Sequence, residues 1–127
     1  MNTLGQQRNE ALNRGELTDR LMGNVEIAQR MVNQFLNSSP QEIDLLESTI
    51  RIGHPQEIAS LAHRHKGTAK TLAAARIAEL SSEIEAQSGE GSISNLLSLL
   101  DALRGAHKQL QQELDDWASE PNDGATE

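Results

Sequence analysis

A histidine, a lysine and a glycine at helical spacing are the residues of this chain best suited to carry chemistry. Residues 62–69 read AHRHKGTA and fall within a stretch whose apolar periodicity predicts a helix. At about 100° per residue, Lys66 lies about 60° to one side of His63 and Gly67 about 40° to the other. A basic side chain beside an exposed imidazole can stabilise a phosphoryl group carried on that ring. The spacing therefore makes His63 a candidate exposed nucleophile.

The second histidine of this stretch is expected to have a different role. His65 lies about 200° from His63 around the helix, on the side of the apolar residues Ile58 and Leu72. It is either a satisfied, partly buried histidine or a residue that tunes local stability, with phosphorylation of His65 as the remaining alternative. His107 falls on the apolar stripe of a later helix, so the two rings could meet across the core.

Positive charge gathers around His63. Residues 58–78 include four basic residues and no acidic residue, although the net charge of the chain is −8. The four are Arg64, Lys66, Lys70 and Arg76. The run is either an ordinary solvated face or a surface that stabilises a phosphoryl group.

Gly67 requires an explanation because a glycine inside a helix costs about 1 kcal/mol relative to alanine. One explanation is close packing against another helix. The other is that a bare backbone beside an exposed nucleophile lets a second protein approach closely. Gly67 shares the face of His63, and this favours the second explanation.

The composition excludes several classes of protein. An acidic chain lacks the basic face of a general nucleic-acid binder, and one Phe, one Trp and no Tyr leave no stacking platform for single strands. The absence of cysteine excludes disulfides and thiolate chemistry. Without a signal-peptide pattern or an apolar run of membrane-spanning length, the chain is expected to be a soluble cytoplasmic protein.

Periodicity and capping signals divide the chain into helices with short connections. The expected segments are a short helix near 4–13, a stretch at 15–23, a long helix at 24–52, and helices at 55–72, 75–87 and 94–117. Within the long helix, Ser39 and Pro40 predict either a bend or a division into two helices nearly in line.

Four substantial amphipathic helices bury their apolar stripes most simply in an antiparallel four-helix bundle. We therefore predict an all-α fold with a short N-terminal helical extension. The expected organisation is an extension packing on the bundle at 1–23, the bundle at 24–119, and a disordered acidic tail at 120–127.

The segment AHRHKGTAKTLAAARIAELSSEIE at 62–85 resembles the signature of histidine-containing phosphotransfer (HPt) domains. The core of that signature reads A-H-x-L-K-G-x-A-x-x-L-G-A. Matching positions are Ala62, His63, Lys66, Gly67, Ala69, Leu72 and Ala74. The segment NQFLNSSP at 33–40 is similar to the preceding long helix of the family, and the helix order agrees from about residue 16 to residue 118.

The resemblance implies a phosphorelay intermediate of two-component signalling without autonomous kinase activity. His63 would accept a phosphoryl group from a receiver-domain aspartate and pass it to another receiver, while Lys66 stabilises the phosphoryl oxygens. The implied partners are response-regulator receiver domains and a hybrid histidine kinase. No cofactor is expected in this chain, since Mg²⁺ belongs to the receiver, and most members of the family are monomers. Candidate partner contacts are Ala59, Ser60, Arg64, Gly67, Lys70 and Arg76.

Two positions depart from the family pattern. Family members usually have leucine where this chain has His65, and glycine where it has Ala73. Ala73 makes a tight, glycine-type end of the His63 helix less expected.

Three other functions fit the sequence less well than phosphotransfer. A metal site is disfavoured because His63 and His65 do not share a helix face. Ser60 and His63 have a spacing that would suit a nucleophile and its base, but no carboxylate in the same helix orients the imidazole. The main alternative is a helical-bundle protein that docks on a histidine kinase or response regulator without carrying phosphate.

Overall fold

The computed structural model describes residues 10–120, and within them the fold is all-α, as the periodicity predicted. The helices are α2 (Arg14–Arg20), α3 (Val25–Ile52), α4 (Pro55–Thr71), α5 (Ala75–Gln87) and α6 (Ile93–Ala118). Residues 1–9 and 121–127 lie outside the described part of the chain. Most of the helix expected near 4–13 and of the tail expected at 120–127 falls within these residues. Residues 10–13 are not helical, so the short helix expected near 4–13 does not extend to them.

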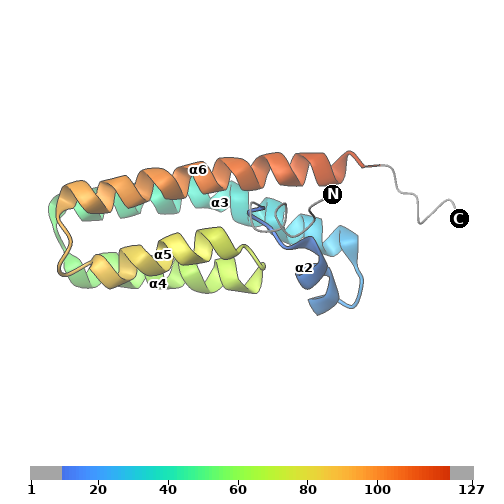
Figure 1. Ribbon diagram of the computed structural model, residues 1–127, viewed down its shortest axis with the longest axis horizontal. Coiled ribbons are helices and arrows are strands. Elements are labelled where there is room, and N and C mark those ends of the chain that lie inside the picture. The colour runs from blue at the N-terminus through green and yellow to red at the C-terminus, as the bar shows by residue number, and fades with distance from the viewer. Residues whose placement is uncertain (1–9, 121–127) are drawn as a thin grey trace, which may run out of the picture.

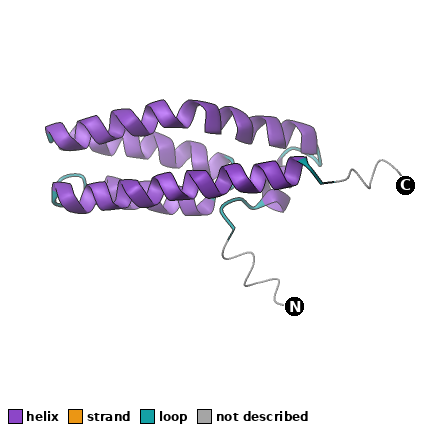
Figure 2. Ribbon diagram, turned by 90° about the horizontal axis from the view of Figure 1, so that it is seen from above, coloured by secondary structure: helices purple, strands orange, loops and turns teal. Residues whose placement is uncertain are grey.

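The four long helices form an antiparallel bundle in which α4 packs on α5, α5 on α6, α6 on α3 and α3 on α4. Figures 1 and 2 show these helices running side by side along the long axis. The α4–α5 pair is shorter than the α3–α6 pair, and α2 lies beyond the turn between α4 and α5 (Figure 1). The N-terminal extension therefore occupies the end of the bundle that the shorter pair leaves open.

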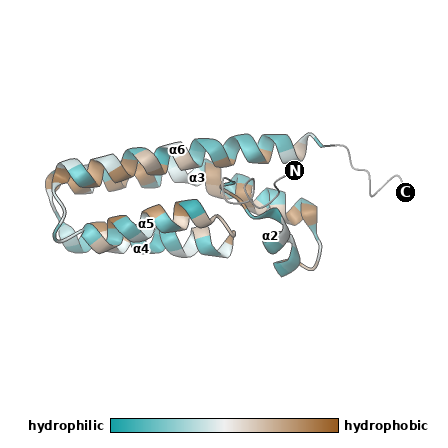
Figure 3. Ribbon diagram, in the orientation of Figure 1, coloured by the Kyte–Doolittle hydropathy of each residue, from teal (hydrophilic) through white to brown (hydrophobic). Residues whose placement is uncertain are grey.

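Amphipathic patterning explains the bundle. Hydrophilic and hydrophobic residues alternate along the long helices (Figure 3), and most of the hydrophobic ones are buried between the helices. The most completely buried aliphatic side chains include Val32, Ile50, Ile58, Ile77, Ile84, Leu100, Leu103 and Leu110. In the part of the chain that the structure describes, no helix is both long and apolar enough to cross a membrane.

Helix α3 continues through Pro40 without interruption, so of the two alternatives for residues 24–52 the single long helix is the one present. Pro40 lacks the N–H that would bond the carbonyl four residues earlier. The hydroxyls of Ser38 and Ser39 donate to the carbonyl of Phe35, at 3.2 and 2.6 Å. The residues buried on either side of Pro40, among them Leu36 and Ile43, lie on the same core face. Packing of that face stabilises the helix across the proline.

The segment before α2 is attached firmly to the bundle. Ala11 and Leu12 are buried, and their backbone N–H groups donate to the two carboxylate oxygens of Glu113 on α6, at 2.8 and 3.0 Å. The Asn13 side chain caps α2 by accepting from the backbone N–H of Glu16. The extension is therefore positioned by contacts far apart in the sequence.

The end of α4 differs from the sequence-based expectation. Ala73 adopts the left-handed conformation with a φ of 59°, which glycine usually provides. Its neighbour Ala74 donates from its backbone N–H to the Ala69 carbonyl at 2.9 Å, as in a tight glycine-type helix end. The prediction that alanine would disfavour such an end is therefore wrong. The backbone N–H of Asn13 donates to the Ala73 carbonyl at 3.0 Å and helps to fix the turn.

Candidate functional site

His63 projects from the middle of α4 into solvent. Helix α4 begins at Pro55, which suits the first helical position because its missing N–H would have no partner there. The side chain of His63 is 67% exposed, whereas His65 is 4% exposed. The helical geometry that separated the two histidines in the sequence is thus present in the structure.

A carboxylate from α5 contacts the exposed imidazole. Nδ1 of His63 lies 3.0 Å from Oε2 of Glu85, and the other oxygen, Oε1, accepts from Nζ of Lys66 at 2.8 Å. The hydrogen bond from Lys66 is the main cause that lowers the pKa of Glu85, so this carboxylate is ionised near neutral pH. An ionised Glu85 accepts from Nδ1–H and selects that tautomer of His63. In that tautomer Nε2 carries the lone pair.

Sequence reasoning missed Glu85. The prediction of a basic surface rested on residues 58–78, which contain no acidic residue, whereas Glu85 lies beyond them on α5. The antiparallel pairing of α4 and α5 was the available signal, because His63 and Glu85 are equally distant along the chain from Ala74 in the turn. Residues equidistant from the turn of a helical hairpin lie opposite each other.

The four basic residues of the predicted island differ in their surroundings. Lys66 is only 19% exposed and bonds to Glu85, while Arg76 forms an ion pair with Glu79 at 3.8 Å. Arg64 and Lys70 are exposed. The island is therefore a mixed surface in which two of the four cations have acidic partners among the described residues.

Gly67 lies on an open surface. A Cβ placed on this residue would meet no atom within 4 Å, so close helix packing does not account for the glycine. Of the other predicted partner contacts on α4, Ser60 is exposed and Ala59 is half-buried. His63 is thus flanked along its helix by small side chains, and an approaching surface meets little obstruction.

His65 is inserted into the core and bonds to His107 of α6. The two Nε2 atoms are 2.9 Å apart, and Nδ1 of His107 donates to the Leu103 carbonyl at 2.9 Å. Phe35 packs on both rings, with centroid separations of 5.1 and 5.4 Å. On the solvent side, Nδ1 of His65 lies 3.0 Å from Oε1 of Glu42. The apolar faces of the two predicted helices allowed the two histidines to meet, and in the structure they do. Both ring nitrogens of His65 therefore have a polar partner.

The two alternative kinds of site find little support in the geometry. His63 and His65 point to opposite sides of α4, and the described residues contain no group of three or more His, Asp or Glu side chains able to hold a metal ion. Glu85 does orient the His63 ring from a neighbouring helix. Within residues 10–120, however, no hydrogen bond joins Ser60 to His63, so no nucleophile–base pair is assembled.

Comparison with known proteins identifies one family. A family model described as Hpt domain matches residues 30–119. The matched region contains α4, α5, α6 and most of α3, whereas α2 precedes it. No curated protein and no solved structure matches the chain.

Proposed function

We propose, from the premise that the chain belongs to the Hpt domain family, that it is a phosphorelay intermediate which carries the phosphoryl group on Nε2 of His63. Hpt domains transfer phosphoryl groups in two-component signalling and are carriers rather than kinases. The observation that carries the proposal is the exposed His63 ring, whose Nδ1 lies 3.0 Å from Oε2 of Glu85, so that Nε2 carries the lone pair. The proposed donors and acceptors are receiver domains, including that of a hybrid histidine kinase.

The site chemistry follows from the tautomer. The lone pair on Nε2 attacks the phosphorus of a receiver's aspartyl phosphate, a P–N bond forms, and the P–O bond to the aspartate carboxylate breaks. No proton leaves Nε2, because that nitrogen carries none. The ring becomes positively charged, and the Glu85 carboxylate beside Nδ1–H stabilises this charge. Transfer to a second receiver is the reverse of these steps.

Lys66 has a role in this mechanism in addition to its bond to Glu85. Its ammonium group bonds to Glu85 next to the ring that would be phosphorylated. Phosphoryl oxygens on Nε2 would introduce new negative charge near that ammonium group, and charge-assisted hydrogen bonds of this kind are strong. We propose that Lys66 is shared between Glu85 and the phosphoryl group. No step requires a cofactor in this chain, and the Mg²⁺ of the reaction would be in the receiver.

The direct test is phosphoryl transfer from purified receiver domains that have been phosphorylated with acetyl phosphate. Acid-labile, base-stable phosphate should appear on this protein, and the phosphate on the receiver should decrease by the same amount. If the protein binds a receiver but never acquires phosphate, the alternative function as a docking protein is correct.

Replacing Gly67 by glutamine should separate stability from transfer. Removal of a glycine from an exposed helix interior is expected to raise the free energy of unfolding by about 0.5–1 kcal/mol. The same side chain would obstruct the approach of a receiver and reduce the transfer rate at least about tenfold. Chemical denaturation and single-turnover transfer assays measure the two effects.

Gly105 offers a matched control for this variant. It also lies inside an exposed helical face, on α6, and a Cβ there would meet nothing within 4 Å. Gly105→Gln should stabilise the protein similarly and leave transfer unchanged. Transfer by Gly67→Gln at the wild-type rate would remove the functional reason for Gly67.

Replacing Glu85 by glutamine should slow phosphoryl acceptance by about tenfold, because the neutral amide stabilises the charged ring less and no longer selects one tautomer. Stopped-flow transfer from a phosphorylated receiver measures the rate. Glu83→Gln provides the control, since Glu83 lies on the same helix and is exposed. Equal rates for the two variants would contradict the role assigned to Glu85.

A further inference from the structure

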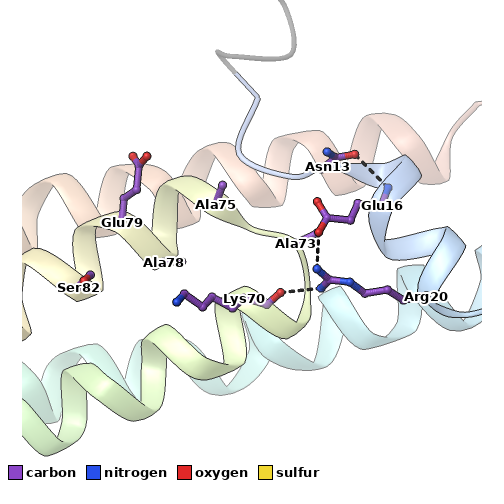
Figure 4. A pocket seen from close by; sticks show the side chains of 9 residues that line it. All are labelled: Asn13, Glu16, Arg20, Lys70, Ala73, Ala75, Ala78, Glu79 and Ser82. Atoms are coloured by element: carbon purple, nitrogen blue, oxygen red, sulfur yellow. Dashed lines mark hydrogen bonds and ion pairs between the residues drawn. The ribbon is translucent and has the colours of Figure 1, made fainter.

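A groove of about 490 Å³ lies between α2 and the α4–α5 turn (Figure 4). Its floor is made by the alanines Ala73, Ala75 and Ala78, and its rim carries Arg20 of α2, Lys70 of α4 and Ser82 of α5. A floor of methyl groups with a charged rim suits an apolar side chain that has a polar neighbour.

The groove continues the surface on which His63 lies. Lys70 is one helical turn beyond Lys66 on α4, and Ser82 is about one turn before Glu85 on α5. Lys66 and Glu85 are bonded to each other beside His63. A protein that covers His63 along the seam between α4 and α5 therefore reaches the groove without leaving that seam.

The α2 wall of the groove is held in place by backbone contacts. The guanidinium group of Arg20 donates to the carbonyls of Lys70 and Thr71, at 2.7 and 2.9 Å. These are carbonyls of the last turn of α4, and that of Lys70 also accepts from the backbone N–H of Ala73 at 3.1 Å. Figure 4 shows Arg20 reaching across from α2 to the end of α4. The wall is thus present before any partner binds.

The charges on the rim indicate what the neighbouring polar group of a partner would be. Arg20 is paired with Glu16, and Glu79 is paired with Arg76. Lys70 is exposed and forms no ion pair among the described residues. A carboxylate on the partner would therefore complement the rim at Lys70.

We propose that this groove receives an apolar side chain of the receiver domain docked at His63, with a carboxylate of the same receiver placed against Lys70. This inference rests on the proposed function and extends it. The α2 wall lies outside the residues that match the family model, so the groove supplies contacts beyond the shared four-helix plan. Receivers that fill it are preferred over receivers that do not.

Two variants and two phosphate donors test the inference. Ala78→Met fills the floor of the groove, and Lys70→Glu reverses the charge on its rim without changing the core. Phosphoramidate, a small donor that needs no docked receiver, reports the reactivity of His63 itself. A set of purified receiver domains phosphorylated with acetyl phosphate reports docking and transfer, and titration of each receiver gives its Kd.

Both variants should accept phosphate from phosphoramidate at the wild-type rate. Their affinity for the receiver that wild type prefers should fall by about tenfold. The differences in Kd between that receiver and the other receivers should therefore become smaller. Lys108→Glu, the same charge reversal on α6, should leave affinity unchanged. If Ala78→Met does not fold, the Lys70→Glu result decides the question.

The possible failures are distinguishable. If wild type transfers phosphate and both variants match its affinities for every receiver, the inference about the groove is wrong and the proposed function stands. If wild type accepts phosphate from no receiver, the proposed function is wrong and the inference fails with it.

Discussion

Replacing His63 by glutamine should abolish phosphoryl acceptance, because the exposed imidazole of α4 is removed. The ring is exposed and is not part of the core, so the free energy of unfolding should change by less than about 0.5 kcal/mol. Transfer of radiolabelled phosphate from a phosphorylated receiver, followed by treatment with acid, measures the loss.

His65→Leu is the matched comparison for His63→Gln. Both nitrogens of His65 are engaged and the residue is 4% exposed, so this variant should still accept phosphate. If His63→Gln still takes up label while His65→Leu does not, the acceptor has been assigned to the wrong histidine.

Lowering the pH from 7 to 5 should destabilise the bundle through its buried histidine pair. Burial lowers the pKa of His107 from 6.5 to about 4, and burial also lowers the pKa of His65. At a pH between 6.5, the pKa of an ordinary histidine, and about 4, the pKa of His107 in the folded protein, the unfolded chain binds a proton that the folded protein does not. The stability from the neutral ring is therefore complete above about pH 6.5 and is lost as the pH falls towards 4. For His107 alone the loss between pH 7 and pH 5 is about 2 kcal/mol.

The hydrogen bonds of the pair explain why His107 resists protonation. Its Nδ1 donates to the Leu103 carbonyl, so Nε2 must accept from His65. A proton on His107 Nε2 would place two N–H groups against each other. The first additional proton is better accommodated on His65, which faces Glu42, than on His107, which also experiences the positive charge of Arg104. A second proton would break the contact that joins α4 to α6.

The double variant His65→Leu/His107→Leu should remove this pH dependence. Replacing both partners by apolar groups of similar size leaves no buried polar atom unpaired, so stability at pH 7 should be maintained or increased. At pH 5 the variant should exceed wild type by about 2 kcal/mol or more. Urea denaturation at the two pH values measures the difference.

Two features of the chain make this pH experiment specific. Glu47 and Glu85 have pKa values lowered from 4.5 by bonds to basic side chains, so their contributions are lost only below about pH 4.5. His54 is exposed at the start of α4, and His54→Gln should leave the pH dependence unchanged. A double leucine variant that loses as much stability as wild type between pH 7 and pH 5 would contradict the explanation.

The sequence by itself determined the class of fold and the separation of the two histidines. Apolar periodicity, Asn24 at the start of α3 and Gly53 at its end define helices through interactions between near neighbours in the chain. The same 3.6-residue period placed His63 outside and His65 inside. These properties depend on local backbone geometry, which can be calculated from spacing alone.

Only the tertiary structure decided which residues meet between helices. Glu85 reaches His63 because of the register of α4 against α5, and His107 meets His65 because of the rotation of α6 against α4. Register and rotation result from packing the whole core, so no short segment encodes them. Packing also maintains α3 through Pro40 and holds Ala73 in a left-handed turn, where local preference pointed the other way. His63 could thus be singled out as the candidate acceptor from its own helix, but the carboxylate beside it could not, because a neighbouring helix supplies it.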